Sequence, residues 1–217
     1  MNDKYNMSKE QNLFLAKRNI IDSIWKSARL EGISVTFPET QAIYDGGNVA
    51  HLNIDEIQLI NNLKHAWKFI FASLDNKLDL NFVCSVNSLV GNNLIESPGK
   101  MRIYNVNMGG TEWKPKLPEQ QDIENIIKDF ENSTCKTEGI LTMMCKLMKL
   151  QYFNDGNKRT SMLIANFELI KNGKGILSIS EQNRVEFGNK LISYYEDETK
   201  LEDLTMWLYD NCLDGIE

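Results

Sequence analysis

The sequence holds few of the residues on which metal sites and disulfide frameworks depend. Histidine occurs only twice in 217 residues, at His51 and His65, which is too few for a metal site built on histidine. Cysteine occurs four times, widely spaced and without the paired rhythm of a zinc site. The four are Cys84, Cys135, Cys145 and Cys212. We expect them to be reduced and partly buried rather than bridged, which suits a cytoplasmic protein.

Basic residues are outnumbered, and long apolar runs are missing. The chain has 24 lysine and arginine residues against 30 acidic ones, so its net charge of −6 gives no support to a nucleic-acid partner. No apolar run approaches the roughly 18 residues of a membrane span. The polar N-terminus also shows no signal-peptide pattern. We therefore expect no membrane partner.

What is present fits one soluble globular domain. Hydrophobic residues make up 42% and charged residues 25%, an ordinary balance for such a protein. The length is enough for one sizeable core, and no linker divides it, so we predict a single domain over residues 1–217. Apolar residues at helical spacing dominate the chain, and an all-α fold is therefore expected.

Capping residues and apolar periodicity place the expected helices. Residues 1–7 are expected to be a frayed terminus, followed by one helix from Ser8 to Gly32. Capping-box spacings mark three further helix starts, at Thr36–Glu39, Asn53–Glu56 and Ser178–Glu181. Apolar stripes predict helices over 54–74, 79–94, 123–130, 141–148, 162–170, 185–191 and 201–208.

Residues 95–118 interrupt the helical rhythm. Proline and glycine punctuate them, at Pro98-Gly99, Gly109-Gly110, Pro115 and Pro118. Met101 to Met108 could form a short hairpin strand, whereas the simpler interpretation is a surface loop.

The stretch from Leu150 to Thr160 combines a turn with a cationic helix start. Asp155-Gly156-Asn157 is a turn signal, and the periodic run that follows ends at Asn172-Gly173. A helix N-terminus offers free backbone N–H groups and the positive end of its dipole, which favours phosphate. Lys158 and Arg159 add two cations there. A capped helix with solvated basic residues is the plainer alternative.

The same stretch resembles the Fic/Doc family signature, His-x-Phe-x-Asp/Glu-Gly/Ala-Asn-x-Arg. The matching residues are Phe153, Asp155, Gly156, Asn157 and Arg159. Lys158-Arg159-Thr160 resembles the Doc version, whereas the family's catalytic histidine falls on Gln151. The resemblance implies a Fic-type helical bundle with a short β-hairpin flap at 95–118 and an active loop at 150–160.

Two further segments are similar to Fic elements. Ser27 and Glu31, followed by Gly32, resemble an inhibitory motif in which the glutamate pairs with a second motif arginine. Met162 stands at that arginine position, so Glu31 is expected to lack its partner. Residues 1–47 would form the inhibitory region and 48–217 the core. Flap residues implied to hold a protein substrate are Arg102, Val106, Met108 and Gly109.

The resemblance also implies cofactors and roles for the motif residues. Asp155 would hold a Mg²⁺ that bridges the phosphates of ATP. Gly156, Asn157, Lys158 and Arg159 would contact those phosphates. Phe153 would anchor the loop in the core. The oligomeric state, including a homo-oligomer, stays open.

Gln151 determines how far activity can be inferred. Fic proteins usually transfer AMP from ATP to a protein hydroxyl, with the histidine as general base. A glutamine amide does not titrate near neutral pH, so AMP transfer is expected to be impaired here. Two alternatives remain: Doc-like phosphate transfer, suggested by Lys158, and a nucleotide-binding regulatory module that transfers nothing.

Overall fold

The computed structural model describes residues 1–216, which form ten α-helices and one two-stranded sheet. The first five helices are α1 (Lys9–Arg18), α2 (Ile20–Leu30), α3 (Phe37–Tyr44), α4 (Ile54–Ala72) and α5 (Leu80–Val90). The next five are α6 (Gln120–Glu131), α7 (Lys136–Leu150), α8 (Asn157–Lys171), α9 (Arg184–Glu196) and α10 (Leu201–Asn211). The strands are β1 (Ile176–Leu177) and β2 (Leu213–Asp214). The prediction of an all-α fold is thus confirmed.

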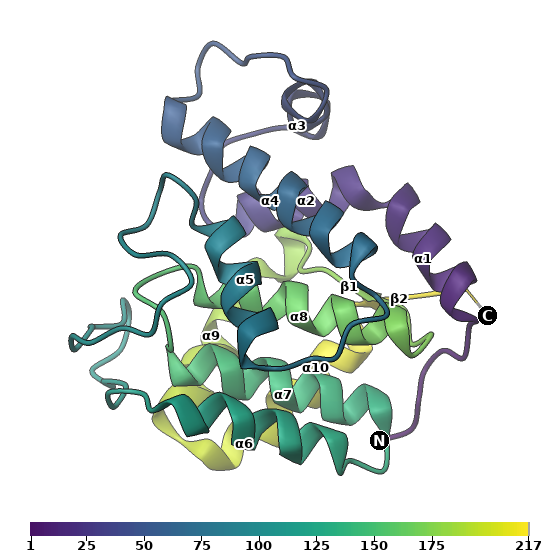
Figure 1. The fold of residues 1–217 in the computed structure, drawn as a ribbon, viewed down its shortest axis with the longest axis vertical. Coiled ribbons are helices and arrows are strands. Elements are labelled where there is room, and N and C mark those ends of the chain that lie inside the picture. Colours follow the sequence, from purple (N-terminus) through teal and green to yellow (C-terminus); the bar gives the residue numbers. More distant parts are fainter. Residues whose placement is uncertain (217) are drawn as a thin grey trace.

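Helix α8 lies at the centre of the bundle. It packs against α7, α5, α1 and α4, and Figure 1 shows it crossing the middle of the molecule. From Thr160 to Ile170 every residue is buried, including the polar Asn166 and Glu168. A helix that is covered on all sides has no solvent face, which explains why its apolar residues run almost without interruption. The start of this buried helix is the motif loop, so the core itself fixes that loop.

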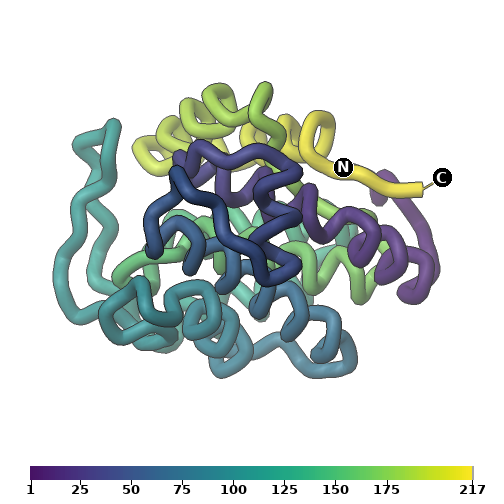
Figure 2. The backbone as a smooth tube through the Cα atoms, turned by 90° about the horizontal axis from the view of Figure 1, so that it is seen from above, coloured from purple at the N-terminus to yellow at the C-terminus, as the bar shows by residue number. Residues whose placement is uncertain are grey.

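The short sheet lies away from the expected flap. Strand β1 follows α8 and pairs antiparallel with β2, with Ile176 opposite Asp214. Residues 95–118 contain no paired strand, and Met101 instead forms an isolated antiparallel bridge with Phe153. In Figure 2 this teal segment projects as an arm that doubles back on itself. Its shape is that of a hairpin, but the expected strand from Met101 to Met108 does not form.

Several helix boundaries differ from the sequence prediction. The first helix is broken at Asn19, whose side-chain amide donates to the Leu15 carbonyl at 2.9 Å and ends α1. Helix α5 stops at Gly91 instead of continuing to residue 94. Ser180, not Ser178, supplies the cap before α9, because its hydroxyl accepts from the Asn183 amide. The capping boxes at Thr36–Glu39 and Asn53–Glu56 are confirmed.

Residues 1–7, here called the N-terminal strap, are docked and not frayed as expected. Asp3 accepts hydrogen bonds from the Thr137 amide at 2.9 Å and from Lys174 Nζ at 3.0 Å. Lys4 Nζ donates to the Tyr209 carbonyl, and the Met7 amide donates to the Gly173 carbonyl, both at 2.9 Å. The strap therefore ties the start of the chain to α7, α8 and the C-terminal segment. Composition gave no sign of this, because these contacts join residues far apart in sequence.

The four cysteines are free, as expected. Cys145 and Cys212 are buried, while Cys84 and Cys135 are half-buried. Burial raises the pKa of the Cys145 thiol, and also raises that of Cys212 to about 12. No helix within residues 1–216 has both the length and the apolar character needed to cross a bilayer.

Candidate active site

The loop between α7 and α8 has a left-handed residue at each end. Gln151 ends α7 with φ 48° and ψ 53°, and Gly156 precedes α8 with φ 76°. Glycine adopts such a φ without strain. A Cβ at Gly156 would also lie 3.1 Å from Val90 Cγ1 and 3.2 Å from Asn87 Nδ2. The loop backbone is therefore packed directly against α5.

The Gln151 side chain points into the protein and is fully hydrogen-bonded. Its Nε2 donates to the Met148 carbonyl at 2.7 Å and lies 3.5 Å from the Tyr195 hydroxyl. Its Oε1 accepts from Asn157 Nδ2 at 3.1 Å. Only 7% of the residue is exposed. At the position of the family's histidine, the chain thus presents a neutral amide held between two helices.

Asn157 and Phe153 shape the loop itself. The Asn157 carboxamide accepts from the Phe153 amide at 3.0 Å and donates to the Phe153 carbonyl at 2.9 Å. Phe153 is 3% exposed, as expected for a residue that anchors the loop in the core. The Asn157 carboxamide is therefore bonded to the backbone of the loop. The family resemblance had implied that it would contact phosphate instead.

Asp155 and Arg159 face each other across the first turn of α8. Asp155 Oδ2 lies 3.1 Å from Arg159 Nη2, while Oδ1 accepts from the Gly156 amide at 2.6 Å. The Asp155 side chain is 68% exposed, but that of Arg159 is only 4% exposed. Gly156 provides no side-chain cap, so the first amides of α8 keep the free N–H groups of a helix start. The Arg159 guanidinium and the N-terminus of α8 are thus directed at the same place.

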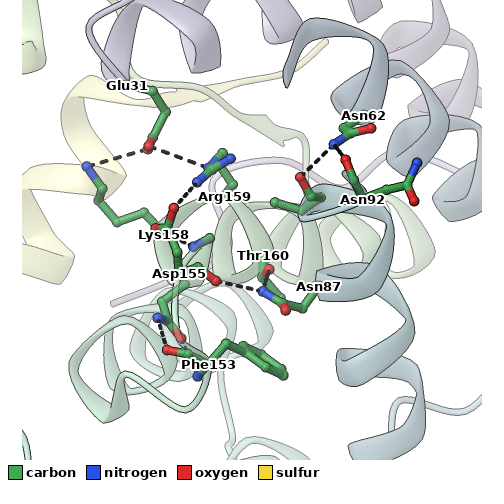
Figure 3. A network of polar contacts seen from close by, with 12 residues as sticks. Glu31, Asn62, Asn87, Asn92, Phe153, Asp155, Lys158, Arg159 and Thr160 are labelled. Atoms are coloured by element: carbon green, nitrogen blue, oxygen red, sulfur yellow. Dashed lines mark hydrogen bonds and ion pairs between the residues drawn. The ribbon is translucent and has the colours of Figure 1, made fainter. Parts of the chain in front are cut away.

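Glu31 lies against the two motif cations, as Figure 3 shows. Its carboxylate oxygens are 3.5 Å from Lys158 Nζ and 3.5 Å from Arg159 Nε. Glu31 Oε1, which faces Lys158, and Arg159 Nε, which faces Glu31 Oε2, are both buried without a hydrogen-bond partner, so these two contacts are ion pairs and not hydrogen bonds. Glu31 lacks the expected second arginine, but it is paired with two other cations. Met162 is buried in the core. Lys158 and Arg159, which precede it, pair with Glu31 instead of the expected arginine.

Ser27 lies one turn before Glu31 on α2 and is buried. Its backbone carbonyl accepts from the Glu31 amide at 3.2 Å. Together with Arg159 and Met162 it lines a cavity of about 10 Å³, no larger than one water needs. Ser27 therefore contributes packing beside the site, whereas the Glu31 carboxylate lies against Lys158 and Arg159.

The four flap residues take different environments. Arg102 is 1% exposed and donates from Nε to the Gln151 carbonyl at 2.5 Å, from Nη1 to Tyr104 and from Nη2 to Lys116. Burial lowers the pKa of this guanidinium. Arg102 thus holds the arm onto the end of α7, with its side chain buried against the protein. Val106 and Met108 are half-buried, and Gly109 is exposed.

Two residues at the site escaped the sequence analysis. Tyr195 in α9 contacts Gln151 and stacks on Trp113 of the arm, with ring centroids 4.9 Å apart. Burial raises the pKa of the Tyr195 phenol, so it does not replace a base at neutral pH. Asn87 in α5 donates to the Asp155 carbonyl. One signal could have revealed Asn87: it is a polar residue on the buried face of a helix, one turn after Val83.

The donor set suits a magnesium nucleotide. Magnesium is usually held by one or two carboxylates together with substrate phosphates, and Asp155 offers one exposed carboxylate. Within residues 1–216 no cluster of three or more His, Cys, Asp or Glu side chains could hold a metal alone. Arg159 has a buried Nε without a hydrogen-bond partner, as a phosphate-binding arginine would. Mg²⁺ would supply charge neutralisation to bound phosphates.

The comparisons with known proteins agree with this fold. Residues 77–169 match the model of the Fic/DOC family, and this segment includes α5, the arm, the motif loop and most of α8. The part of the chain that holds the motif loop is therefore similar to the Fic/DOC family. No curated protein matches the sequence significantly.

Solved structures share the fold at low sequence identity. A Fic domain-containing signaling protein from Bacteroides thetaiotaomicron is 14% identical, with TM-score 0.75, over 94% of this chain and 86% of that one. Fic-1 from C. elegans is 19% identical, with TM-score 0.75, over 90% of this chain but only 61% of the Fic-1 chain. A Fic family protein from Desulfovibrio desulfuricans is 18% identical, with TM-score 0.68, over 93% and 66% of the two chains.

Proposed function

We propose that this chain binds Mg-ATP at the loop before α8 and is a Fic-type protein AMP transferase with impaired turnover. The observation that carries the proposal is the arrangement of Asp155, Arg159 and the α8 N-terminus. It brings a hard oxygen ligand, a buried guanidinium and free amides to one place. Phosphoryl-group transfer mainly demands neutralisation of phosphate charge, and these groups provide it.

The impairment follows from Gln151. A hydroxyl that attacks a phosphorus must lose its proton, and a neutral carboxamide cannot accept one near neutral pH. Both ends of this carboxamide are also occupied by Met148 and Asn157. The loss of a general base lowers rates by about 10²–10⁴-fold, so binding survives while transfer is slow. A protein substrate would approach along the projecting arm at residues 95–118, where strand addition gives affinity with little demand on sequence.

The hydrogen bonds of Gln151 also favour a second candidate, a nucleotide-binding regulatory module that transfers nothing. In that case the glutamine would be a structural link between α7 and α8. Doc-like phosphate transfer, suggested by Lys158, is the remaining alternative. The mass added to a target protein distinguishes the three, since AMP, phosphate and no addition differ.

The binding proposal is tested by calorimetric titration of Mg-ATP into the protein and two variants. Arg159→Ala should weaken binding, because a charged hydrogen-bonding partner of phosphate contributes about 1.5–3 kcal/mol. Arg18→Ala is the matched control, since Arg18 is exposed on α1, away from the loop. Absence of heat, together with no competition by any nucleotide, would remove the binding site.

A further inference from the structure

A single buried carboxamide on α5 connects the motif loop to the base of the arm. Asn87 Nδ2 donates to the Asp155 carbonyl and to Thr160 Oγ1, both at 3.1 Å. Its Oδ1 accepts from the Gly99 amide at 2.8 Å. The residue is fully buried. Figure 3 shows Asn87 directed at Thr160 and the Asp155 backbone from the neighbouring helix.

The three bonds fix the two backbone segments that meet at the site. Gly156 has φ 76°, and a Cβ there would lie close to Asn87 and Val90, so the loop backbone passes close to α5. Gly99 has the same φ, and a Cβ there would lie 2.7 Å from the Cys84 carbonyl. The carbonyl that Asn87 holds belongs to Asp155. The carboxylate of the same residue is exposed, and it is bonded only to the Gly156 amide and to Arg159, both within the motif.

We infer that Asn87 is a positioning residue that sets the direction of the Asp155 carboxylate for a divalent cation. It would act through the Asp155 backbone that it holds, because Asp155 carries the only carboxylate of the motif loop and that carboxylate is exposed. A ligand residue held in place beforehand binds a metal more tightly than one that must be ordered on binding. This inference rests on the proposed function, because it concerns the Mg²⁺-dependent part of nucleotide binding.

A second asparagine provides the matched control. Asn62 in α4 is 1% exposed and also donates twice from Nδ2, to the Val90 carbonyl at 3.1 Å and the Asn92 carbonyl at 2.7 Å. It holds the end of α5 and does not contact the motif loop. Asn62→Asp and Asn87→Asp therefore both place a buried carboxylate oxygen against backbone carbonyls, two at Asn62 and one at Asn87, and only the second faces Asp155.

The experiment measures ATP affinity with Mg²⁺ and with EDTA for both variants. Asn87→Asp keeps the acceptor for Gly99, and Thr160 can reverse its bond, but a carboxylate oxygen now faces the Asp155 carbonyl. We expect Mg-ATP binding to weaken at least about tenfold, equivalent to 1.4 kcal/mol, with less than about a threefold change in EDTA. Asn62→Asp should keep the wild-type ratio of the two affinities.

Hydrogen exchange of the peptide covering 153–160, without nucleotide, gives a second readout. Asn87→Asp should speed this exchange, and Asn62→Asp should leave it unchanged. If the wild type binds no ATP, the proposed function fails, and faster exchange alone still supports the positioning of the loop. A wild-type affinity ratio in Asn87→Asp, or an equal change in Asn62→Asp, would overturn the inference.

A milder variant covers the case in which Asn87→Asp does not fold. Thr160→Val removes only the hydroxyl that accepts one of the Asn87 bonds. It should show a smaller loss in the same direction, again confined to the Mg²⁺-dependent affinity. An affinity ratio equal to that of the wild type would count against the inference as directly as the first variant.

Discussion

At the scale of single residues, the proposed function predicts that the Gln151 amide permits nucleotide binding but slows group transfer. Gln151→His should raise transfer about 10²-fold or more, because imidazole accepts a proton near neutral pH. Histidine also tolerates the left-handed backbone found here better than most residues. The measurement is single-turnover transfer with α- and γ-labelled ATP, which also distinguishes AMP from phosphate as the transferred group.

Gln151→Ala is the control for that experiment, since it removes the same hydrogen bonds without adding a base. Its activity should not rise. Equal gains in the two variants would show that release of the buried amide, and not proton transfer, had been limiting. A histidine variant that binds nucleotide but modifies nothing would favour the regulatory module.

Asp3 gives the strap a pH dependence. Burial alone would raise its pKa, but bonds from the Thr137 amide, Lys174 and the Thr137 hydroxyl outweigh it and lower the pKa to about 2. A carboxylate whose pKa is lowered on folding stabilises the protein above its unfolded pKa of 3.8, and this stabilisation is lost as the pH falls toward 2. Asp3→Asn should therefore lower the Tm at pH 7, with a difference that shrinks between about pH 4 and 2.

Thermal melts over a series of pH values check this prediction. Asp45→Asn is a suitable control, because Asp45 is exposed at the end of α3. It should melt like the wild type throughout. A Tm difference for Asp3→Asn that stays constant down to pH 2 would show that the carboxylate's charge contributes nothing.

At the scale of elements, α2 places a negative charge on the cations of α8. Glu31→Gln should strengthen Mg-ATP binding by roughly fivefold, the scale of about 1 kcal/mol for a single ion pair, because Lys158 and Arg159 no longer share their charge with α2. In the Gln151→His background it should also raise self-modification. Titration calorimetry and intact mass measure the two effects.

Asp22→Asn is the matched control for Glu31. Asp22 lies on the same helix but pairs with Lys26 at 2.6 Å and does not reach the motif. Its loss should leave ATP affinity unchanged. Equal affinities for wild type and Glu31→Gln would mean that the contact with Lys158 and Arg159 does not compete with phosphate.

Local signals predicted the helices well and the long-range contacts poorly. The capping boxes at Thr36 and Asn53, and the burial of Met144 and Met148, were expected and observed. The break at Asn19 was not, because a side-chain bond to the Leu15 carbonyl interrupts a stripe that is otherwise periodic. Local pattern cannot show which of two competing bonds a polar side chain makes.

The candidate site divides in the same way. The turn at Asp155 to Asn157 and the buried Phe153 followed from the motif. The inward direction of Arg102, the pairing of Glu31 with Lys158, and Asn87 depend on how separate helices pack, which spacing along one segment does not encode. The single domain over residues 1–217 stays a prediction.

At the scale of the whole molecule, the strap binds the two ends of the chain together. A Cβ on Gly215 would lie 2.3 Å from the Tyr5 ring, so Gly215→Ala should lower the free energy of unfolding by about 1–3 kcal/mol. Gly188→Ala, within α9 and with nothing near its Cβ, should instead raise it by about 0.5–1 kcal/mol. Denaturant titration compares the two, and a stable Gly215→Ala protein would show that the strap shifts without cost.

The two buried thiols make it possible to follow where the chain opens. Cys145 lies in the core on α7, whereas Cys212 precedes β2, beside the segment that the strap covers. A thiol with a raised pKa and no solvent contact reacts with an alkylating reagent only while its surroundings are open. Pulse alkylation followed by peptide mass spectrometry would therefore time two events separately. We expect release of the C-terminal segment to expose Cys212 first, and Cys145 to react only when the whole core opens.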